Sequence, residues 1–181
     1  MTEFSQNTII PETYKLLFSE ETIMKRIAEL GQAIQRDFAG KKPILIGVLN
    51  GGFVFLSDLI RHINTDLEID FIRISSYGDT RESSGHIKIL KPLSADIRER
   101  AVIVVEDIVD SGLSIQFLSN MMSAFEPSEL KFATLLHKPG RTIVEITLDY
   151  VGFEIEDKFV VGYGLDDAQI KRNLRGIYIV G

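Results

Sequence analysis

The sequence contains no cysteine and only three histidines among its 181 residues. Without thiols the chain can form neither a disulfide framework nor a thiolate metal site or nucleophile, and its composition is compatible with a reducing cytoplasm. The histidines, His62, His86 and His137, have neither the mutual spacing of metal ligands nor a helical H-E-x-x-H pattern. We therefore expect core or surface roles for them, and these shortages argue against thiol chemistry and a histidine-bound metal centre.

Long apolar runs and an excess of positive charge are also missing. No hydrophobic stretch approaches the length needed to span a bilayer, and residues 1–7 lack the basic and apolar regions of a secretory signal. The formal net charge is −6, whereas general binders of nucleic acids or membrane surfaces present a basic face to phosphates. We therefore expect a cytoplasmic protein that binds neither nucleic acid nor membrane, although a local basic pocket is compatible with this charge.

The length and composition are those of an ordinary globular protein. With 45% hydrophobic and 25% charged residues, a chain of this length can bury a sizeable core. We find no internal repeat, low-complexity tail or linker. Residues 1–181 are therefore expected to form a single domain.

The most informative stretch is residues 102–115, V-I-V-V-E-D-I-V-D-S-G-L-S-I. Four consecutive β-branched residues, 102–105, predict a strand buried on both faces, as in a parallel sheet covered by helices. The apolar run ends at Glu106 and Asp107, and a polar loop follows. An apolar period of three to four then resumes at Ile115, Leu118, Met122 and Phe125. The pattern predicts a strand, a polar loop and a helix in an α/β protein.

A loop between the carboxyl end of a parallel strand and a helix N-terminus is a usual place for ligands in α/β sheets. Gly112 can adopt a positive φ that turns backbone N–H groups inward, and the hydroxyls of Ser111 and Ser114 add donors. Together with the positive end of the helix dipole, these groups predict a phosphate-binding loop.

The carboxylates of Glu106, Asp107 and Asp110 surround this loop and would repel a phosphate unless they bind something else. Glu106 and Asp107 could accept hydrogen bonds from vicinal ribose hydroxyls or lie near a divalent cation, which would leave Asp110 free for proton transfer. Taken alone, the same residues also fit a solvated strand end followed by a turn and a helix cap.

Other segments fit the same architecture. Ser19 and Gly40 bound a predicted helix whose apolar face is Ile23, Ile27, Leu30, Ile34 and Phe38. Residues 44–49 (I-L-I-G-V-L) predict a second buried strand, which ends at Asn50, Gly51 and Gly52 before an apolar helical face at Phe53, Leu56, Leu59 and Ile60. The two glycines indicate either a close backbone approach to a ligand or an ordinary tight turn.

The remaining chain contains three further predicted strands, at residues 68–75, 130–137 and 176–180. Residues 76–86 are rich in glycine and serine and predict a mobile surface loop, and residues 91–100 read as a connector. By pattern alone, Lys138 would be a solvated charge at a strand end and Phe159 a core residue.

Several of these segments resemble known motifs. V-V-E-D-I-V-D-S-G-L-S closely resembles the motif with which type I phosphoribosyltransferases bind phosphoribosyl pyrophosphate (PRPP). L-N-G-G-F-V-F resembles the pyrophosphate loop of the purine enzymes, in which a non-proline cis peptide, here the bond before Asn50, exposes backbone amides. D-F-I-R-I-S-S-Y-G followed by S-G-H-I-K-I resembles the flexible catalytic loop of hypoxanthine-guanine phosphoribosyltransferases.

The resemblance extends over residues 44–175 and implies a fold and an assembly. The implied type I phosphoribosyltransferase fold is a twisted, mainly parallel sheet flanked by helices, with a small hood formed from the termini. The implied assembly is a homodimer or homotetramer.

The resemblance also implies roles for individual residues. PRPP or the nucleotide is held by Asn50, Gly51, Glu106, Asp107, Ser111, Gly112, Leu113, Ser114 and Arg172. The purine is bound by Lys138, Phe159, Val160 and Asp166. In this scheme Lys138 donates to the exocyclic oxygen of a 6-oxopurine, Phe159 stacks on the ring and Val160 reads its edge through its backbone. Ser76 and Tyr77 close over the pyrophosphate.

The implied reaction joins hypoxanthine or guanine to PRPP, giving the nucleoside monophosphate (IMP or GMP) and pyrophosphate, with Asp110 as the base at purine N7. Mg²⁺ is the implied cofactor, near Glu106, Asp107 and Asp166. The chain departs from the family pattern at Asn50, where many relatives have lysine, and near Asp167 and Lys171, where relatives have aromatic residues.

Two alternatives remain open from the sequence. One is a non-catalytic regulator that senses PRPP, because this fold is reused for gene control. The other is a phosphoribosyltransferase for another base, such as xanthine or a pyrimidine.

Overall fold

The main sheet has six strands and runs through the middle of the protein. The structure is a computed structural model that describes residues 10–76 and 87–181. The strand order is β4-β3-β2-β5-β6-β7. The bounds are β2 (Ile44–Leu49), β3 (Glu68–Ser76), β4 (Ile87–Lys91), β5 (Ala101–Val109), β6 (Glu129–His137) and β7 (Tyr150–Glu154). All neighbours are parallel except β3 and β4, which are antiparallel.

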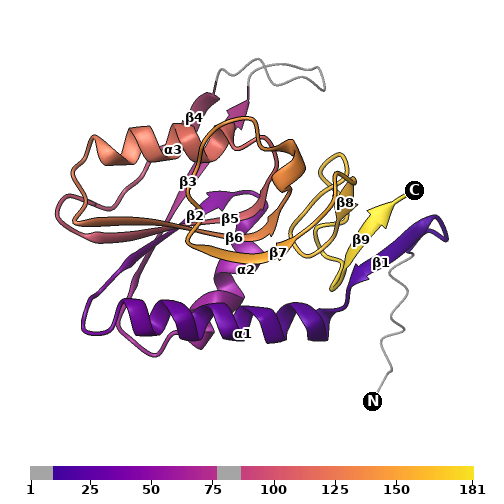
Figure 1. The fold of residues 1–181 in the computed structure, drawn as a ribbon, viewed down its shortest axis with the longest axis horizontal. Coiled ribbons are helices and arrows are strands. Elements are labelled where there is room, and N and C mark those ends of the chain that lie inside the picture. Colours follow the sequence, from indigo (N-terminus) through magenta and orange to yellow (C-terminus); the bar gives the residue numbers. More distant parts are fainter. Residues whose placement is uncertain (1–9, 77–86) are drawn as a thin grey trace.

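Helices cover both faces of this sheet, as expected for central strands that are apolar on both sides (Figure 1). Helices α1 (Glu20–Asp37) and α2 (Gly52–Leu59) cover one face, and α3 (Leu113–Ser123) covers the other. The alternation of β5 supplies both cores, because Ile103 and Val105 pack with α1 and α2, whereas Val102 and Val104 pack with α3. Two short 3₁₀ helices, η1 (Ile60–His62) and η2 (Pro139–Arg141), follow α2 and β6.

The start of α1 shows how the sequence sets an element boundary. The Ser19 hydroxyl accepts a hydrogen bond from the Thr22 N–H at 3.2 Å, and Glu20 and Glu21 lie in the first turn, where the helix dipole favours negative charge. Gly40 has φ +76° just after the helix. The predicted helix is therefore confirmed at both ends.

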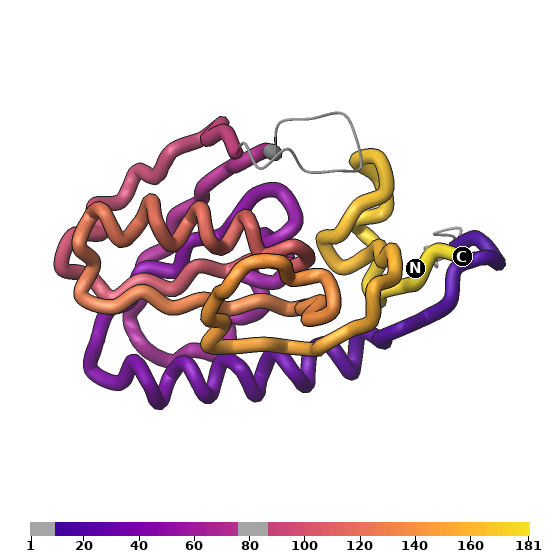
Figure 2. Tube along the Cα trace, turned by 45° about the horizontal axis from the view of Figure 1, so that its top comes forward, coloured from indigo at the N-terminus to yellow at the C-terminus, as the bar shows by residue number. Residues whose placement is uncertain are grey.

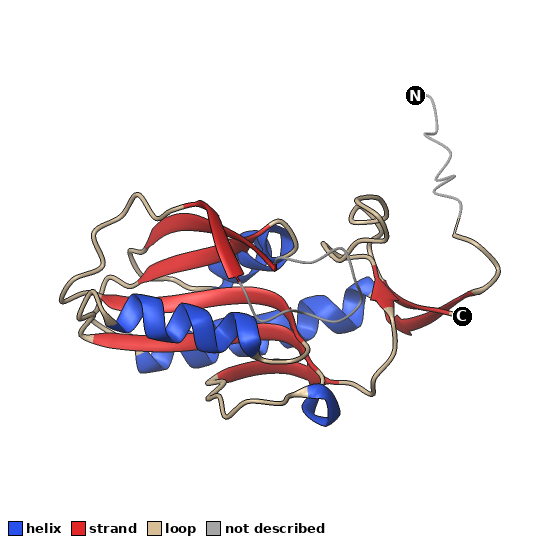
Figure 3. Ribbon diagram, turned by 90° about the horizontal axis from the view of Figure 1, so that it is seen from above, coloured by secondary structure: helices blue, strands red, loops and turns tan. Residues whose placement is uncertain are grey.

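A second, smaller sheet is built from both ends of the chain. Strand β1 (Tyr14–Phe18) pairs with β9 (Ile177–Val180), which in turn pairs with β8 (Val160–Val161), and all pairs are antiparallel. In Figure 3, β1 and β9 extend beyond one end of the main sheet. We call residues 10–18 and 155–181 the hood. The expected fold, a mainly parallel sheet between helices with a hood from the termini, is confirmed.

Three expectations about individual residues need correction. Strand β5 does not end at Glu106 but continues to Val109, because its ladder with β6 extends to the pair of Val109 and His137. Phe53 is exposed, and the buried face of α2 uses Phe55 instead. Phe125 is also exposed, because α3 ends before it at Ser123.

Two general observations complete the fold. Strands β1, β4, β7 and β8 were not anticipated from the sequence pattern. In residues 10–76 and 87–181, no helix has the length and apolar character needed to cross a membrane.

Candidate active site

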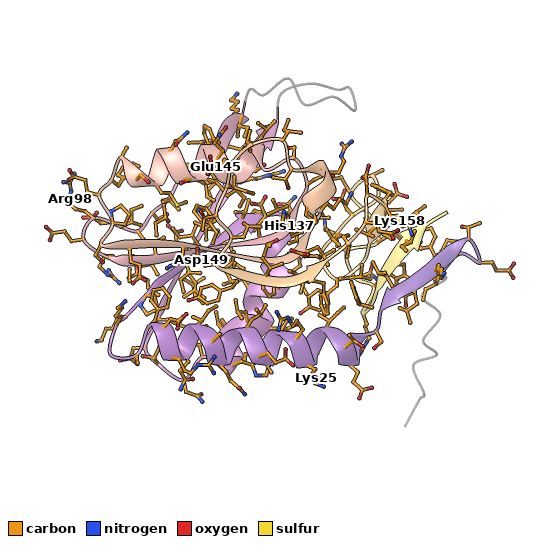
Figure 4. The ribbon with its side chains drawn as sticks, in the orientation of Figure 1. Lys25, Arg98, His137, Glu145, Asp149 and Lys158 are labelled. Atoms are coloured by element: carbon orange, nitrogen blue, oxygen red, sulfur yellow. The ribbon has the colours of Figure 1, made fainter. Side chains whose placement is uncertain are left out.

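The carboxyl ends of β2, β5 and β6 lie at the end of the main sheet that faces the hood. Figure 2 shows the yellow C-terminal segment at this end, and Figure 4 places Lys158, just before β8, at the opposite end of the molecule from Arg98, just before β5. A direct contact joins the two parts, since the Lys138 Nζ after β6 lies 3.5 Å from Asp157 Oδ1 of the hood. This edge is where open α/β sheets bind ligands.

The continuation of β5 through Glu106 and Asp107 places these carboxylates on opposite faces of the sheet. Glu106 lines a cavity of about 90 Å³ together with the loop before α3, whereas Asp107 points toward the loop after β2. Glu106 is 8% exposed, and its Oε2 has no hydrogen-bond partner among the residues that the structure describes. Burial, with the nearby Asp107 charge, raises the pKa of Glu106 to about 8. This orphaned acceptor is available to a ligand hydroxyl.

Asp107 lies against the backbone of Gly51. A β-carbon at Gly51 would overlap the Asp107 carboxylate, so only glycine allows this approach. The peptide bond between Leu49 and Asn50 is cis, as the resemblance predicted. Burial raises the pKa of Asp107 to about 6 and the Asp166 charge adds to this rise, while the backbone N–H groups of Asp107 and Ile108 and the Arg172 charge oppose it.

The loop from Ser111 to Ser114 forms the wall of the cavity beside Glu106. Gly112 has φ +83° and precedes the first residue of α3, Leu113, whose N–H donates to the Ser111 hydroxyl at 3.4 Å. The first turn of α3 therefore directs N–H groups and the positive end of its dipole toward the cavity. The arrangement suits a phosphate group.

The side chains of Lys138 and Asp110 meet at the mouth of the site. The Lys138 ammonium donates to Asp110 Oδ2 at 3.2 Å, and the residue is only 6% exposed. Arg141 Nε donates to Asp110 Oδ1 at 3.1 Å, and Asp157 lies 3.8 Å from the same guanidinium nitrogen. Two cations and two carboxylates thus form a neutral cluster. Sequence reasoning missed Arg141 and Asp157, although both stand close to predicted site residues, in K-P-G-R and D-K-F.

The hood supplies an aromatic surface beside this cluster. Phe159 is 55% exposed, in contrast to the core role that pattern alone would suggest. Its carbonyl accepts a hydrogen bond from the Val180 N–H at 3.0 Å, and Val160 is buried in β8. An exposed ring on a backbone fixed in this way can stack on a planar ligand.

A second hood segment carries Arg172 and Asp166. Arg172 Nη2 lies 2.7 Å from Asp166 Oδ1, and its Nη1 donates to the Gly164 carbonyl at 2.7 Å. Gly164, whose carbonyl is bonded to Arg172, lies against the Gly51 carbonyl, which places this segment next to the loop of Asn50 and Gly51. The expected pyrophosphate ligands are therefore brought together from the main sheet and the hood.

Two further features bear on the expected site. The side chain of Ser76, at the end of β3, and all of Tyr77 lie outside the described residues. Within the described ranges, no three His, Cys, Asp or Glu side chains are grouped to hold a metal ion. The donor set that fits a hard cation is the neighbouring pair Asp107 and Asp166, completed by water or ligand oxygens.

Comparisons with known proteins agree with this geometry. A model of the phosphoribosyl transferase domain matches residues 14–168. The hypoxanthine-guanine phosphoribosyltransferase of Bacillus subtilis is 45% identical over 160 residues, which cover 88% of this chain and 89% of that protein.

Solved structures are similar as well. A crystal structure of a hypoxanthine-guanine phosphoribosyltransferase from Bacillus anthracis has a TM-score of 0.89 and 49% identity, and the match covers 92% of this chain and 98% of that one. The hypoxanthine phosphoribosyltransferase of Trypanosoma cruzi, in complex with the product IMP, has a TM-score of 0.88 and 37% identity over 95% and 97% of the two chains. This chain belongs to the phosphoribosyl transferase family and, within it, to the hypoxanthine-guanine phosphoribosyltransferases.

Proposed function

We propose that this protein transfers the phosphoribosyl group of PRPP to hypoxanthine or guanine, forming IMP or GMP and releasing pyrophosphate. The pairing of Lys138 with Asp110 is the observation that carries the proposal. A 6-oxopurine presents O6 and N7 on one edge. An ammonium and a carboxylate separated by 3.2 Å can donate to O6 and accept from N7–H at the same time. Adenine would present an amino group to the ammonium and leave donors unpaired.

In the proposed reaction, N9 of the purine forms a bond to C1 of the ribose while the bond from C1 to the pyrophosphate oxygen breaks. The N7 proton passes to a carboxylate oxygen of Asp110. Phe159 stacks on the purine. The Val160 backbone and Asp166 form the other side of the purine pocket. Closure of the loop that contains Ser76 and Tyr77 would exclude water from the reactive ribose centre.

The other half of the site binds PRPP. Glu106, with its unpaired Oε2, accepts hydrogen bonds from the ribose hydroxyls. Residues 111–114 hold the 5-phosphate in the cavity next to α3. Asn50, Gly51 and Arg172 hold the pyrophosphate. Mg²⁺ would be held beside Asp107 and Asp166, whereas Glu106 lies on the opposite face of β5. When bound, the metal ion neutralises charge on the leaving group.

A non-catalytic regulator that senses PRPP is the rival from another class. The ordered Lys138 and Asp110 pair disfavours it, since a sensor of PRPP alone has no use for a base-binding edge. Among the phosphoribosyltransferases, one specific for xanthine or a pyrimidine remains the second alternative. The family resemblance further supports a cytoplasmic homodimer or homotetramer that binds neither nucleic acid nor membrane, which sedimentation analysis and cell fractionation would test.

The test is an ultraviolet assay with PRPP, Mg²⁺ and each purine in turn. We expect turnover with hypoxanthine and guanine and none with adenine. Asp110→Asn should lower kcat by about 10²- to 10⁴-fold with PRPP binding retained. Asp66→Asn is the matched control, because Asp66 is an exposed residue whose contact with Lys42 is 3.8 Å long. Unchanged turnover in Asp110→Asn would remove Asp110 from the role of base, and absence of turnover with every purine would refute the proposed activity.

A further inference from the structure

The pyrophosphate half of the site is assembled from two separate parts of the chain. Asn50 and Gly51 precede α2, whereas Asp166 and Arg172 belong to the hood. The two parts touch where Gly164, at φ +96°, lies against the Gly51 carbonyl, so closely that a β-carbon at Gly164 would overlap that oxygen. Their relative position therefore decides whether both can contact one pyrophosphate.

The hood segment makes a tight turn next to this contact. Gly162 and Leu165 exchange two backbone hydrogen bonds, at 3.0 and 3.1 Å, and Gly162, Tyr163 and Gly164 all have positive φ. Tyr163 has φ +51°, a conformation that is unfavourable for a residue with a side chain. The Arg172 side chain and backbone are both bonded to Gly164, so the position of this turn sets the position of Arg172.

A side-chain hydrogen bond joins the turn to α2. The Tyr163 hydroxyl donates to Asp58 Oδ2 at 2.5 Å, and Tyr163 is buried. Asp58 lies in the last turn of the helix that begins at Gly52. We propose that Tyr163 and Asp58 are positioning residues that hold the hood turn against α2 and so align Arg172 and Asp166 with the pyrophosphate loop. This inference rests on the proposed function, because it specifies which half of that site the pair serves.

The pair should affect one substrate and not the other. Lys138 and Asp110, which would bind the purine edge, lie on other segments. Phe159 precedes Tyr163 by four residues, but its backbone is held separately by the Val180 N–H. Among the described residues, none of these three has a hydrogen bond or ion pair with Tyr163 or Asp58. Loss of the Tyr163 bond would let the turn shift relative to Gly51, and the pyrophosphate would lose simultaneous contact with both parts. A buried hydrogen bond to a charged group is worth roughly 10- to 100-fold in an equilibrium constant. Because Tyr163 and Asp58 do not touch the pyrophosphate themselves, only part of this should reach its affinity, and we expect a change of about five- to tenfold.

The experiment measures steady-state kinetics and calorimetric binding of pyrophosphate with Mg²⁺. For Tyr163→Phe we expect KM for PRPP and Kd for pyrophosphate to rise about five- to tenfold, with KM for hypoxanthine within about twofold of wild type. Asp58→Ala should do the same, and the double variant should be no worse than either single one. Asp58→Asn keeps an acceptor oxygen and should restore most of the PRPP affinity.

The matched control is Tyr150→Phe. The Tyr150 hydroxyl donates to Asp37 Oδ2 at 2.7 Å, so this variant removes the same type of buried bond between β7 and α1, far from the pyrophosphate loop. It should lower Tm without changing KM for PRPP. Equal changes in the KM values of both substrates would overturn the inference while leaving the proposed function intact. So would a Tyr163→Phe variant whose Tm is lower but whose KM for PRPP and Kd for pyrophosphate are unchanged. A wild-type protein without turnover would refute the function itself, and its pyrophosphate Kd would still be compared with that of Tyr163→Phe.

Discussion

At the scale of single residues, the clearest functional sign is a buried cation placed for a ligand. Lys138 is 6% exposed, and a buried ammonium is costly unless carboxylates compensate its charge. Asp110 and Asp157 supply that compensation, at 3.2 and 3.5 Å. Both carboxylates remain partly exposed, so the pair is fixed in place before a purine arrives and still accessible to it.

Removal of the Lys138 charge should therefore impair purine use selectively. We expect Lys138→Met to lower kcat/KM for hypoxanthine by about 100-fold, the effect of losing a hydrogen bond from a charged donor to O6. KM for PRPP should change little. Lys131→Met is a suitable control, because Lys131 lies on β6, the strand that precedes Lys138, but pairs with Asp149 at 2.8 Å. An unaltered KM for hypoxanthine in Lys138→Met would contradict the assigned role.

At the scale of elements, one carboxylate fastens the connector after β4 to the main sheet. Asp70 on β3 accepts hydrogen bonds from the N–H groups of Ser94 and Ala95 at 2.6 and 2.9 Å and from the Lys91 ammonium at 3.3 Å. Burial alone would raise the pKa of Asp70, but the hydrogen bonds from Ala95, Phe71, Ser94 and Lys91 together lower it below its ordinary value. Strand β4 and the connector are held in place through this group.

The lowered pKa gives the stability a defined pH dependence. A carboxylate with a depressed folded-state pKa stabilises the protein above its unfolded pKa, about 4, and this contribution is lost as the pH falls through the folded value. We expect Asp70→Asn to reduce the free energy of unfolding by about 2 kcal/mol at pH 7. The gap from wild type should narrow below about pH 4.

Urea unfolding of both proteins between pH 7 and pH 3 measures this difference. Asp66→Asn, at an exposed ion pair, should match wild type throughout this range. A gap that stays constant with pH would show that the Asp70 charge is not the source of the stabilisation.

At the scale of the whole molecule, the hood and the main sheet share one hydrophobic core. Ile27 of α1, Val105 of β5, and Val160 and Ile177 of the hood belong to the same buried cluster. A core that crosses both parts couples their unfolding, which supports the proposal that residues 1–181 form a single domain.

We expect one cooperative transition in differential scanning calorimetry, with equal calorimetric and van't Hoff enthalpies. Ile177→Ala removes a fully buried side chain of the hood and should lower the single Tm by roughly 5–10 °C. If the hood were independent, the variant would instead show a separate low-temperature transition, with the main transition unmoved.

Much of the architecture was predictable from local sequence patterns. β-Branched runs identified β2 and β5, and Ser19 and Gly40 identified the ends of α1. Errors arose where a local pattern was ambiguous. The polar residues Glu106 and Asp107 suggested a strand end, but the ladder with β6 continues through them. Phe53 was placed on a buried helical face, but α2 packs through Phe55 instead.

The sequence by itself determined the α/β class and the loop around Gly112, because these depend on short contiguous segments, whereas the cis peptide before Asn50 was expected only from the resemblance of its motif to the family. Only the tertiary structure decided which distant residues meet. Arg141 and Asp157 beside Asp110, and Tyr163 against Asp58, are brought together by strand order and by the docking of the hood. Local propensity does not encode such contacts, since they depend on the packing of segments that are far apart in the chain.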